Sequence, residues 1–237
     1  MSLTAVSLKT KIYKPEMDLV DFILESVPKE IVKEKMVLAI TSKIVSLAEH
    51  RLVKKSEIDK VTLVKQEADV FLNEIAENIF LTIKDGLFIA SAGIDESNSQ
   101  DGDYILYPKD SFLSAKNLWL ALREKWGLNE LGIILTDSHV TPLRRGVTGV
   151  CLSYYGFKAV RSLVGEKDLF GKPLKFTSQN FADGLSATAV MLMGEAAESR
   201  PLAIIQGAEI DFCANTNPEE LKMPLDEDLF YPFFKKS

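Results

Sequence analysis

Residues 79–90 read IFLTIKDGLFIA, and this stretch decides the choice of fold class. Two short apolar runs, 79–83 and 87–90, flank Lys84-Asp85-Gly86. Asp-Gly suits the positive φ angles of a tight turn, so the stretch predicts an antiparallel β-hairpin. Hairpins mixed with irregularly ordered helices favour an α+β fold with mixed or antiparallel sheets over a doubly wound sheet. The Rossmann loop GxGxxG and the Walker sequence GxxxxGK[ST] are both absent from the chain, which disfavours the two commonest nucleotide folds.

Hydrophobic periodicity on either side of the hairpin predicts the other elements. Helices are expected at 17–27, 42–52, 64–78, 114–126 and 183–197. Buried strands are expected at 35–41, 131–136, 146–156 and 201–207. Gly127 is placed to end the fourth helix and Asp183 to cap the fifth. The aromatic residues of the tail, 217–234, are expected to dock on the body or on a partner subunit.

Composition indicates one globular domain, 1–237, without a separable linker, repeat or low-complexity segment. The N-terminal segment lacks the continuous apolar stretch of a signal peptide, and no window is long enough to span a membrane. Cys151 and Cys213 are the only cysteines, and both are expected to be reduced. A net charge of −6 argues against nucleic acid as a partner. We expect a cytoplasmic protein with neither membrane nor nucleic-acid contacts.

Three acidic residues are candidate ligands for a divalent metal. Asp95 follows the hairpin, Asp137 ends the run GIILT, and Glu195 is expected on an apolar helix, where it interrupts Ala-Val-Met-Leu-Met-Gly. Carboxylate oxygens suit Mg²⁺ or Mn²⁺, which usually take further ligands from substrate phosphates. Taken singly, each acid is more commonly a turn residue or a helix cap.

Two basic segments are candidate sites for phosphate. Arg144-Arg145-Gly146 stands seven residues beyond Asp137, and guanidinium groups match phosphate oxygens, although surface salt bridges explain the pair equally well. Thr41-Ser42-Lys43 places a hydroxyl, an ammonium and free N–H groups at an expected helix start, which suits an anion but is also an ordinary cap. His50 and His139, the only histidines, support neither a zinc site nor a catalytic triad.

Several segments together resemble the coenzyme F-420-0:γ-glutamyl ligase family. They appear in the family's order and run from about residue 10 to residue 207. The matching stretches are TSKIVSLAEHR (41–51), SAGIDESN (91–98), ILTDSHVTPLRRGVTGV (134–150), GEKDLFGKPL (165–174) and FADGLSATAVMLMGEAAE (181–198).

The resemblance implies two intimately joined lobes in an intertwined homodimer, and it implies a set of site residues. Divalent metal, Mg²⁺ or Mn²⁺ with K⁺ as a helper, is implied at Asp95, Asp137, Ser138 and Glu195. Arg144 and Arg145 are the candidate catalytic cations. GTP, or ATP in its place, is implied to contact Thr10, Lys11, Ile12, Tyr13, Ser42, Lys43, Asn98, Met193, Gly194, Ala196, Ala197, Glu198, Ser199 and Arg200.

The activity that the resemblance implies is that of an acid–amino-acid ligase. Such an enzyme adds L-glutamate to a small carboxylate acceptor, coenzyme F-420-0 or a related molecule, through an acyl phosphate. This chain departs from the family's usual pattern in three places: Leu47 replaces a lysine, His50 replaces a glycine, and His139-Val140-Thr141 stand where Gly-Arg is usual. These departures keep two alternatives open, the same chemistry on a pterin acceptor (as in dihydrofolate synthesis) and a non-catalytic nucleotide-binding regulator.

Overall fold

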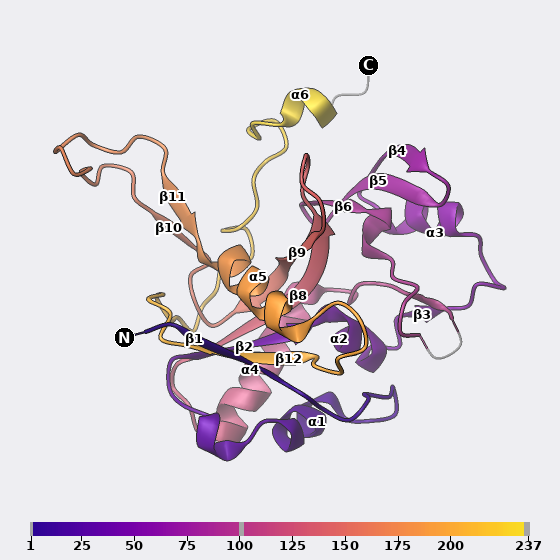
Figure 1. Ribbon diagram of the computed structural model, residues 1–237, viewed down its shortest axis with the longest axis horizontal. Helices are drawn as coiled ribbons and strands as arrows, with labels where there is room; N and C mark the ends of the chain where they lie inside the picture. Colours follow the sequence, from indigo (N-terminus) through magenta and orange to yellow (C-terminus); the bar gives the residue numbers. More distant parts are fainter. Residues whose placement is uncertain (1, 100–101, 235–237) are drawn as a thin grey trace.

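The computed structural model describes residues 2–99 and 102–234, and a five-stranded sheet lies at its centre (Figure 1). Strands β2 and β8 are parallel, and the other neighbouring pairs are antiparallel. The sheet is therefore mixed, as expected for an α+β fold. Across the sheet the strands are β1 (Thr4–Leu8), β12 (Leu202–Gln206), β2 (Met36–Thr41), β8 (Leu131–Val140) and β9 (Val147–Tyr155).

Both faces of the central sheet are covered by helices, which explains why β2 reads as a continuous apolar run. Met36, Leu38 and Ile40 pack in one cluster with residues of α1 (Leu19–Ser26) and α4 (Ser111–Trp126). The alternate residues of β2, Val37 and Ala39, pack with α5 (Phe181–Met193) on the opposite face. Gly127 ends α4 in the left-handed conformation at φ 65°, as predicted.

A separate three-stranded sheet contains the predicted hairpin. Strands β5 (Ile79–Lys84) and β6 (Leu87–Ala90) pair antiparallel, and both turn residues, Asp85 at φ 52° and Gly86 at φ 80°, have the positive φ that the sequence requires. The third strand of this sheet is β4 (Val70–Ala76), and helix α3 (Lys60–Glu67) packs against it.

The helix predicted at 64–78 is wrong, because α3 ends at Glu67 and the chain then pairs with β5 as β4. Helix α3 begins earlier than predicted, where the Asp59 carboxylate accepts a hydrogen bond from the N–H of Thr62. Strand β4 contains two register shifts, which break the alternation of apolar and polar residues that identifies a strand. Pairing with an available strand edge thus outweighs the helical spacing of the apolar residues.

Short elements lie between the central sheet and the three-stranded sheet along the chain. Helix α2 (Ser42–Ala48) leaves the central sheet directly after β2, and β3 (Leu52–Val53) then pairs with β7 (Tyr104–Ile105). Two 3₁₀ turns, η1 (Lys29–Ile31) and η2 (Ser91–Gly93), precede β2 and follow β6.

The hairpin arm and the tail extend from the body (Figure 1). The arm comprises β10 (Val160–Ser162), β11 (Ser178–Asn180) and the loop between them. The tail crosses the end of β9, where the Tyr154 hydroxyl donates to the carbonyl of Asn217, and it finishes in α6 (Tyr231–Phe234). The expected docking of tail aromatics is seen at Phe234, whose ring lies 5.1 Å from that of Phe88.

Two predicted helix ends are corrected by the structure. Helix α2 stops at Ala48, four residues short of its expected end, because His50 takes the left-handed conformation at φ 53°. Helix α5 runs from Phe181 to Met193, and its cap is Asn180, whose side chain accepts from the N–H of Asp183. Asp183 is therefore not the cap.

Within the described part of the chain, no helix combines the length and the apolar character needed to cross a bilayer.

Candidate functional site

The strand register brings the predicted site segments to one edge of the central sheet. Thr41, the last residue of β2, pairs with Thr136 of β8, and Asp137 follows directly. Leu202, at the start of β12, pairs with Leu8 at the end of β1 and with Ile40 of β2. The residues that follow β1 and β2 and those that precede β12 therefore meet at the carboxyl ends of the parallel pair, a common position for ligand sites.

Two backbone hydrogen bonds hold this edge together. The N–H of Thr10 donates to the carbonyl of Ser199 at 2.9 Å, and the N–H of Thr41 donates to the carbonyl of Pro201 at 3.0 Å. Three segments far apart in the sequence are thus connected without side-chain contributions.

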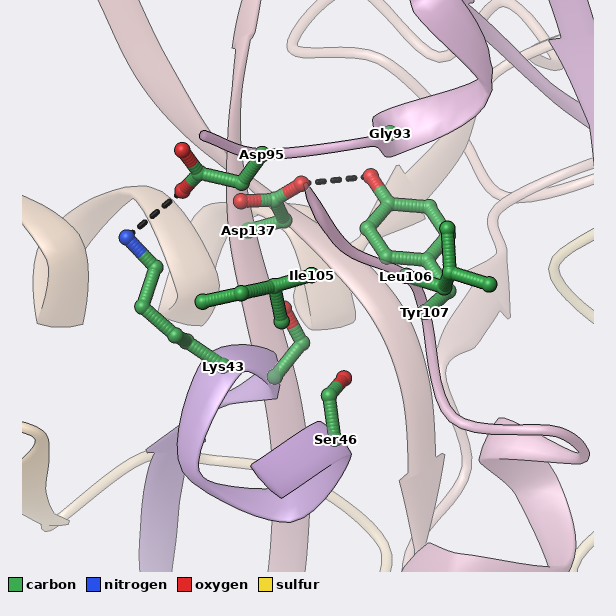
Figure 2. A pocket seen from close by; sticks show the side chains of 9 residues that line it. Lys43, Ser46, Gly93, Asp95, Ile105, Leu106, Tyr107 and Asp137 are labelled. Atoms are coloured by element: carbon green, nitrogen blue, oxygen red, sulfur yellow. Dashed lines mark hydrogen bonds and ion pairs between the residues drawn. The ribbon is translucent and has the colours of Figure 1, made fainter. Parts of the chain in front are cut away.

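A pocket opens between this edge and the segments 93–95 and 105–107, and it contains Asp95 and Asp137 (Figure 2). Asp95 reaches it because its backbone exchanges two hydrogen bonds, of 2.9 and 2.8 Å, with Ile105. Lys43 reaches it from the first turn of α2. The pocket is lined by Ser42, Lys43, Ser46, Gly93, Asp95, Ile105, Leu106, Tyr107 and Asp137.

Asp95 is ionised in this environment. One oxygen, Oδ2, lies 2.6 Å from the ammonium of Lys43, and the other, Oδ1, accepts from the N–H of Ser97 at 2.6 Å. Burial by itself would raise the pKa of Asp95. The hydrogen bonds from Lys43 and Ser97 outweigh burial and leave that pKa below its ordinary value.

The pKa of Asp137 is shifted in the opposite direction from that of Asp95. Burial raises the pKa of Asp137 to about 6, although hydrogen bonds from the Tyr107 hydroxyl and from the N–H of Ser138 act to lower it. The nearby charge of Asp95 raises the same pKa further. The phenol of Tyr107 donates to Oδ2 of Asp137 at 2.5 Å, and burial followed by the charge of Asp137 raises the pKa of Tyr107 well above its ordinary value.

Close packing on Gly93 fixes the ring of Tyr107. A Cβ atom at Gly93 would come within 2.1 Å of that ring, and the backbone of Gly93 has φ 71°. Only glycine meets both requirements without cost.

The pair Asp95 and Asp137 fits a divalent cation. Their side chains lie next to each other in the pocket, with the carboxylate of Asp95 pointing towards Lys43 and that of Asp137 bonded to Tyr107 (Figure 2). The charge of Asp95 contributes to the raised pKa of Asp137. A hard cation between them would relieve the repulsion between these two carboxylates, and oxygen donors of this type suit Mg²⁺ or Mn²⁺.

Glu195 is not in the pocket lining. It was expected on a helix, but α5 ends at Met193, and Gly194 at φ 84° turns the chain away. Glu198 then accepts from the N–H of Ala196 at 2.8 Å and stabilises the turn. Glu195 is exposed there. Over residues 2–99 and 102–234, no three His, Cys, Asp or Glu side chains converge as a metal site.

The expected nucleotide contacts lie in three places. Ser42 and Lys43 line the pocket, and the segments 10–13 and 193–200 meet at the sheet edge through the Thr10–Ser199 hydrogen bond. Within them, Tyr13 is buried and donates to the carbonyl of Met17 at 2.7 Å, so its hydroxyl has a structural partner. Asn98 is exposed, in the loop that follows Asp95.

Arg144, Arg145 and Ser138 also lie outside the pocket lining. The two arginines are exposed in the turn that joins β8 to β9. Ser138 follows Asp137 on β8, and because successive strand residues point to opposite faces, its side chain leaves the sheet away from that of Asp137. Ser138 acts on Asp137 through its backbone N–H, which lowers the pKa of that carboxyl.

Sequence reasoning missed Tyr107, Gly93 and Ser46. Tyr107 is buried among apolar residues and belongs to no motif with a defined spacing, so its contact with Asp137 could be seen only in three dimensions. Of the departures from the family pattern, Leu47 packs against the apolar core, and His50 keeps the left-handed backbone that the usual glycine adopts freely.

Comparison with known proteins gives a consistent result. A family model described as F420-0:Gamma-glutamyl ligase matches residues 7–207. The coenzyme F420:L-glutamate ligase of Methanopyrus kandleri is 33% identical over 219 residues, 85% of each chain. The enzyme of the same name from Methanocaldococcus jannaschii is 36% identical over 181 residues, which is 76% of this chain and 72% of the relative.

The family match covers strands β2, β8, β9 and β12 of the central sheet, the three-stranded sheet and every residue of the pocket lining. The relatives are also similar over most of their own length. On these grounds the chain belongs to the F420-0:gamma-glutamyl ligase family.

Proposed function

We propose that this chain is a ligase that joins the amino group of L-glutamate to a carboxylate of a coenzyme F420 precursor, using a nucleoside triphosphate and a divalent cation. The observation that carries the proposal is the pairing of Asp95 and Asp137 in one pocket, beside Lys43 and next to the sheet edge. Family membership supplies the reaction class, since the relatives are coenzyme F420:L-glutamate ligases.

The chemistry of amide formation accounts for the kind of residues present. A carboxylate is a poor electrophile, so its oxygen first attacks the γ-phosphorus of the nucleotide, the nucleoside diphosphate leaves, and an acyl phosphate forms. The glutamate amine then attacks the acyl carbon, and phosphate leaves with the C–O electron pair while the amine loses its proton. A bound divalent cation would supply charge neutralisation at the phosphoryl oxygens.

The chain's own residues have distinct roles in this scheme. Asp95 and Asp137 hold the cation, and Lys43 supplies a second positive charge from the start of α2. The segments 10–13 and 193–200 meet at the same edge of the central sheet through the Thr10–Ser199 hydrogen bond, and we assign nucleotide contacts to them. The scheme requires no nucleophilic side chain, and acyl-phosphate hydrolysis is limited by excluding water.

We assign the nucleotide as GTP with K⁺ as an auxiliary ion, on the strength of family membership alone. Arg144 and Arg145 are proposed to reach the phosphates through the exposed turn after β8, and Glu195 to act as the third acid. The arm between β10 and β11 exposes Leu169, Phe170 and Phe176, which supports a homodimer in which a second copy covers these side chains.

The test of the proposed reaction is a matrix of incubations. Each contains the protein, Mn²⁺ or Mg²⁺, L-glutamate, and GTP or ATP, with one acceptor from a panel that includes F420-0 and dihydropteroate. Released phosphate is measured and the product is identified by mass.

Acceptor-dependent phosphate release with a mass gain of one glutamyl residue on F420-0 supports the proposal. Phosphate release with dihydropteroate and not with F420-0 would support the ligase reaction but show that the acceptor is a pterin. Nucleotide binding without release under any condition would contradict the ligase assignment. Size-exclusion chromatography with light scattering tests the dimer, and a monomer would overturn that part.

A further inference from the structure

Tyr107 holds one of the two oxygens of Asp137. Its phenol donates to Oδ2 at 2.5 Å. Figure 2 shows the other oxygen of Asp137 on the side of Asp95, away from the phenol. The two oxygens of Asp137 therefore have different surroundings, and only one of them is bonded to the phenol.

The position of Tyr107 is fixed on several sides. Its ring packs against Gly93 so closely that a Cβ atom there would overlap it. Its carbonyl accepts from Nε of Arg51 at 2.9 Å, and the side chain is 4% exposed in a cluster with Ile89 and Leu152. A phenol held in this way cannot follow a carboxylate that rotates, so it restrains the rotation of Asp137.

We propose that Tyr107 is a positioning residue that limits Asp137 to one-oxygen coordination and thereby selects small octahedral cations against Ca²⁺. Mg²⁺ demands near-ideal octahedral geometry with short bonds, whereas Ca²⁺ takes six to eight ligands and accepts two-oxygen carboxylates. A carboxylate with one oxygen bonded to a phenol has one oxygen left for the cation. This is enough for octahedral Mg²⁺, but it removes the two-oxygen coordination that favours Ca²⁺. The inference rests on the proposed metal site at Asp95 and Asp137.

The test compares cation affinities of the full chain without substrates. Mn²⁺ binding is followed by electron paramagnetic resonance, and Mg²⁺ and Ca²⁺ are titrated as competitors. The variants are Tyr107→Phe and, as a control, Tyr155→Phe, whose hydroxyl donates to the carbonyl of Ala214 at 3.1 Å. Circular dichroism and thermal unfolding establish that each variant is folded.

In wild type and in Tyr155→Phe, Mg²⁺ should compete better than Ca²⁺. In Tyr107→Phe, the ratio of the Ca²⁺ to the Mg²⁺ dissociation constant should fall by about tenfold, the equivalent of one hydrogen bond to a charged group. A Tyr107→Phe variant in which both cations weaken equally would overturn the inference, because that is the result of a merely structural role.

Two further outcomes are informative. If Tyr107→Phe unfolds, Tyr107→Trp and Gly93→Ala displace the phenol by different means, and an unchanged ratio in whichever of them folds also overturns the inference. If wild type binds none of the three cations, the metal site in the proposed function is wrong. If wild type binds the cations but Tyr107→Phe leaves the ratio unchanged, only the inference about Tyr107 is wrong.

Discussion

Lys43 and Asp95 form an ion pair of 2.6 Å that joins α2, at the edge of the central sheet, to the loop that follows the β5–β6 hairpin. Lys43 also donates to the carbonyl and the hydroxyl of Ser97, at 3.2 and 3.0 Å. The ammonium of Lys43 acts to lower the pKa of both Asp95 and Asp137. It therefore partly neutralises the two carboxylates, as a bound divalent cation would.

Replacing Lys43 by methionine should therefore make the fold more dependent on metal. Without the ammonium, Asp95 and Asp137 repel each other unopposed, and the melting temperature of the metal-free protein should fall. The rise in melting temperature on adding Mn²⁺ should be larger in Lys43→Met than in wild type, because binding relieves more repulsion. Differential scanning calorimetry with and without Mn²⁺ measures both quantities.

The control for this experiment is Lys55→Met, which removes an ammonium that pairs with Glu96 outside the pocket. Its Mn²⁺-induced shift should equal that of wild type. A Mn²⁺-induced shift in Lys43→Met equal to or smaller than that of wild type would contradict the role of Lys43 in neutralising Asp95 and Asp137.

Asp137→Asn should stabilise the metal-free fold at neutral and alkaline pH. Because the pKa of Asp137 is about 6 in the folded chain and its ordinary value is 3.8, ionisation opposes folding. This cost appears as pH rises above the ordinary pKa and is complete above the folded pKa, where it amounts to about 3 kcal/mol at most. The amide oxygen of asparagine still accepts from the Tyr107 phenol.

Urea unfolding in the presence of a chelator checks this prediction. Asp137→Asn should exceed wild type in free energy of unfolding at about pH 8, and the difference should vanish towards about pH 4. A difference of the same size at both pH values would show that the effect does not come from ionisation.

Gly93→Ala should destabilise the protein by at least about 2 kcal/mol, since it combines a left-handed backbone with overlap between a methyl group and the Tyr107 ring. Gly184 provides the matched control. It lies inside α5, and a Cβ atom there meets nothing within 4 Å. Gly184→Ala should stabilise by about 0.5–1 kcal/mol through helix propensity. Equal effects of the two substitutions on urea unfolding would contradict the packing described for Tyr107.

Four of the five strands of the central sheet, and the hairpin, could be predicted because their signals are local, whereas the edge strand β1 was not predicted. Strand β2 is a short apolar run buried on both faces, and Asp85-Gly86 specifies its own turn. Register was not predictable from local patterns. Only the pairing of Thr41 with Thr136, and of Leu202 with Ile40, brings the site segments to one edge.

The errors have identifiable physical causes. Strand β4 was mistaken for a helix because two bulges remove its alternation. The end of α5 was placed too late because Ala196 and Ala197 continue a helical composition, while Gly194 and the Glu198 side chain form a turn. Tyr107 was missed because a buried tyrosine in sequence cannot be distinguished from ordinary core.

The central claim is that Asp95 and Asp137 together hold a divalent cation, and isothermal titration with Mn²⁺ tests it most directly. Wild type and Asp211→Asn, a control at an exposed acid that pairs with Arg161, should bind with the same affinity. Asp95→Asn and Asp137→Asn should each lose at least about tenfold in affinity while remaining folded. Binding at wild-type affinity in both pocket variants would contradict the account.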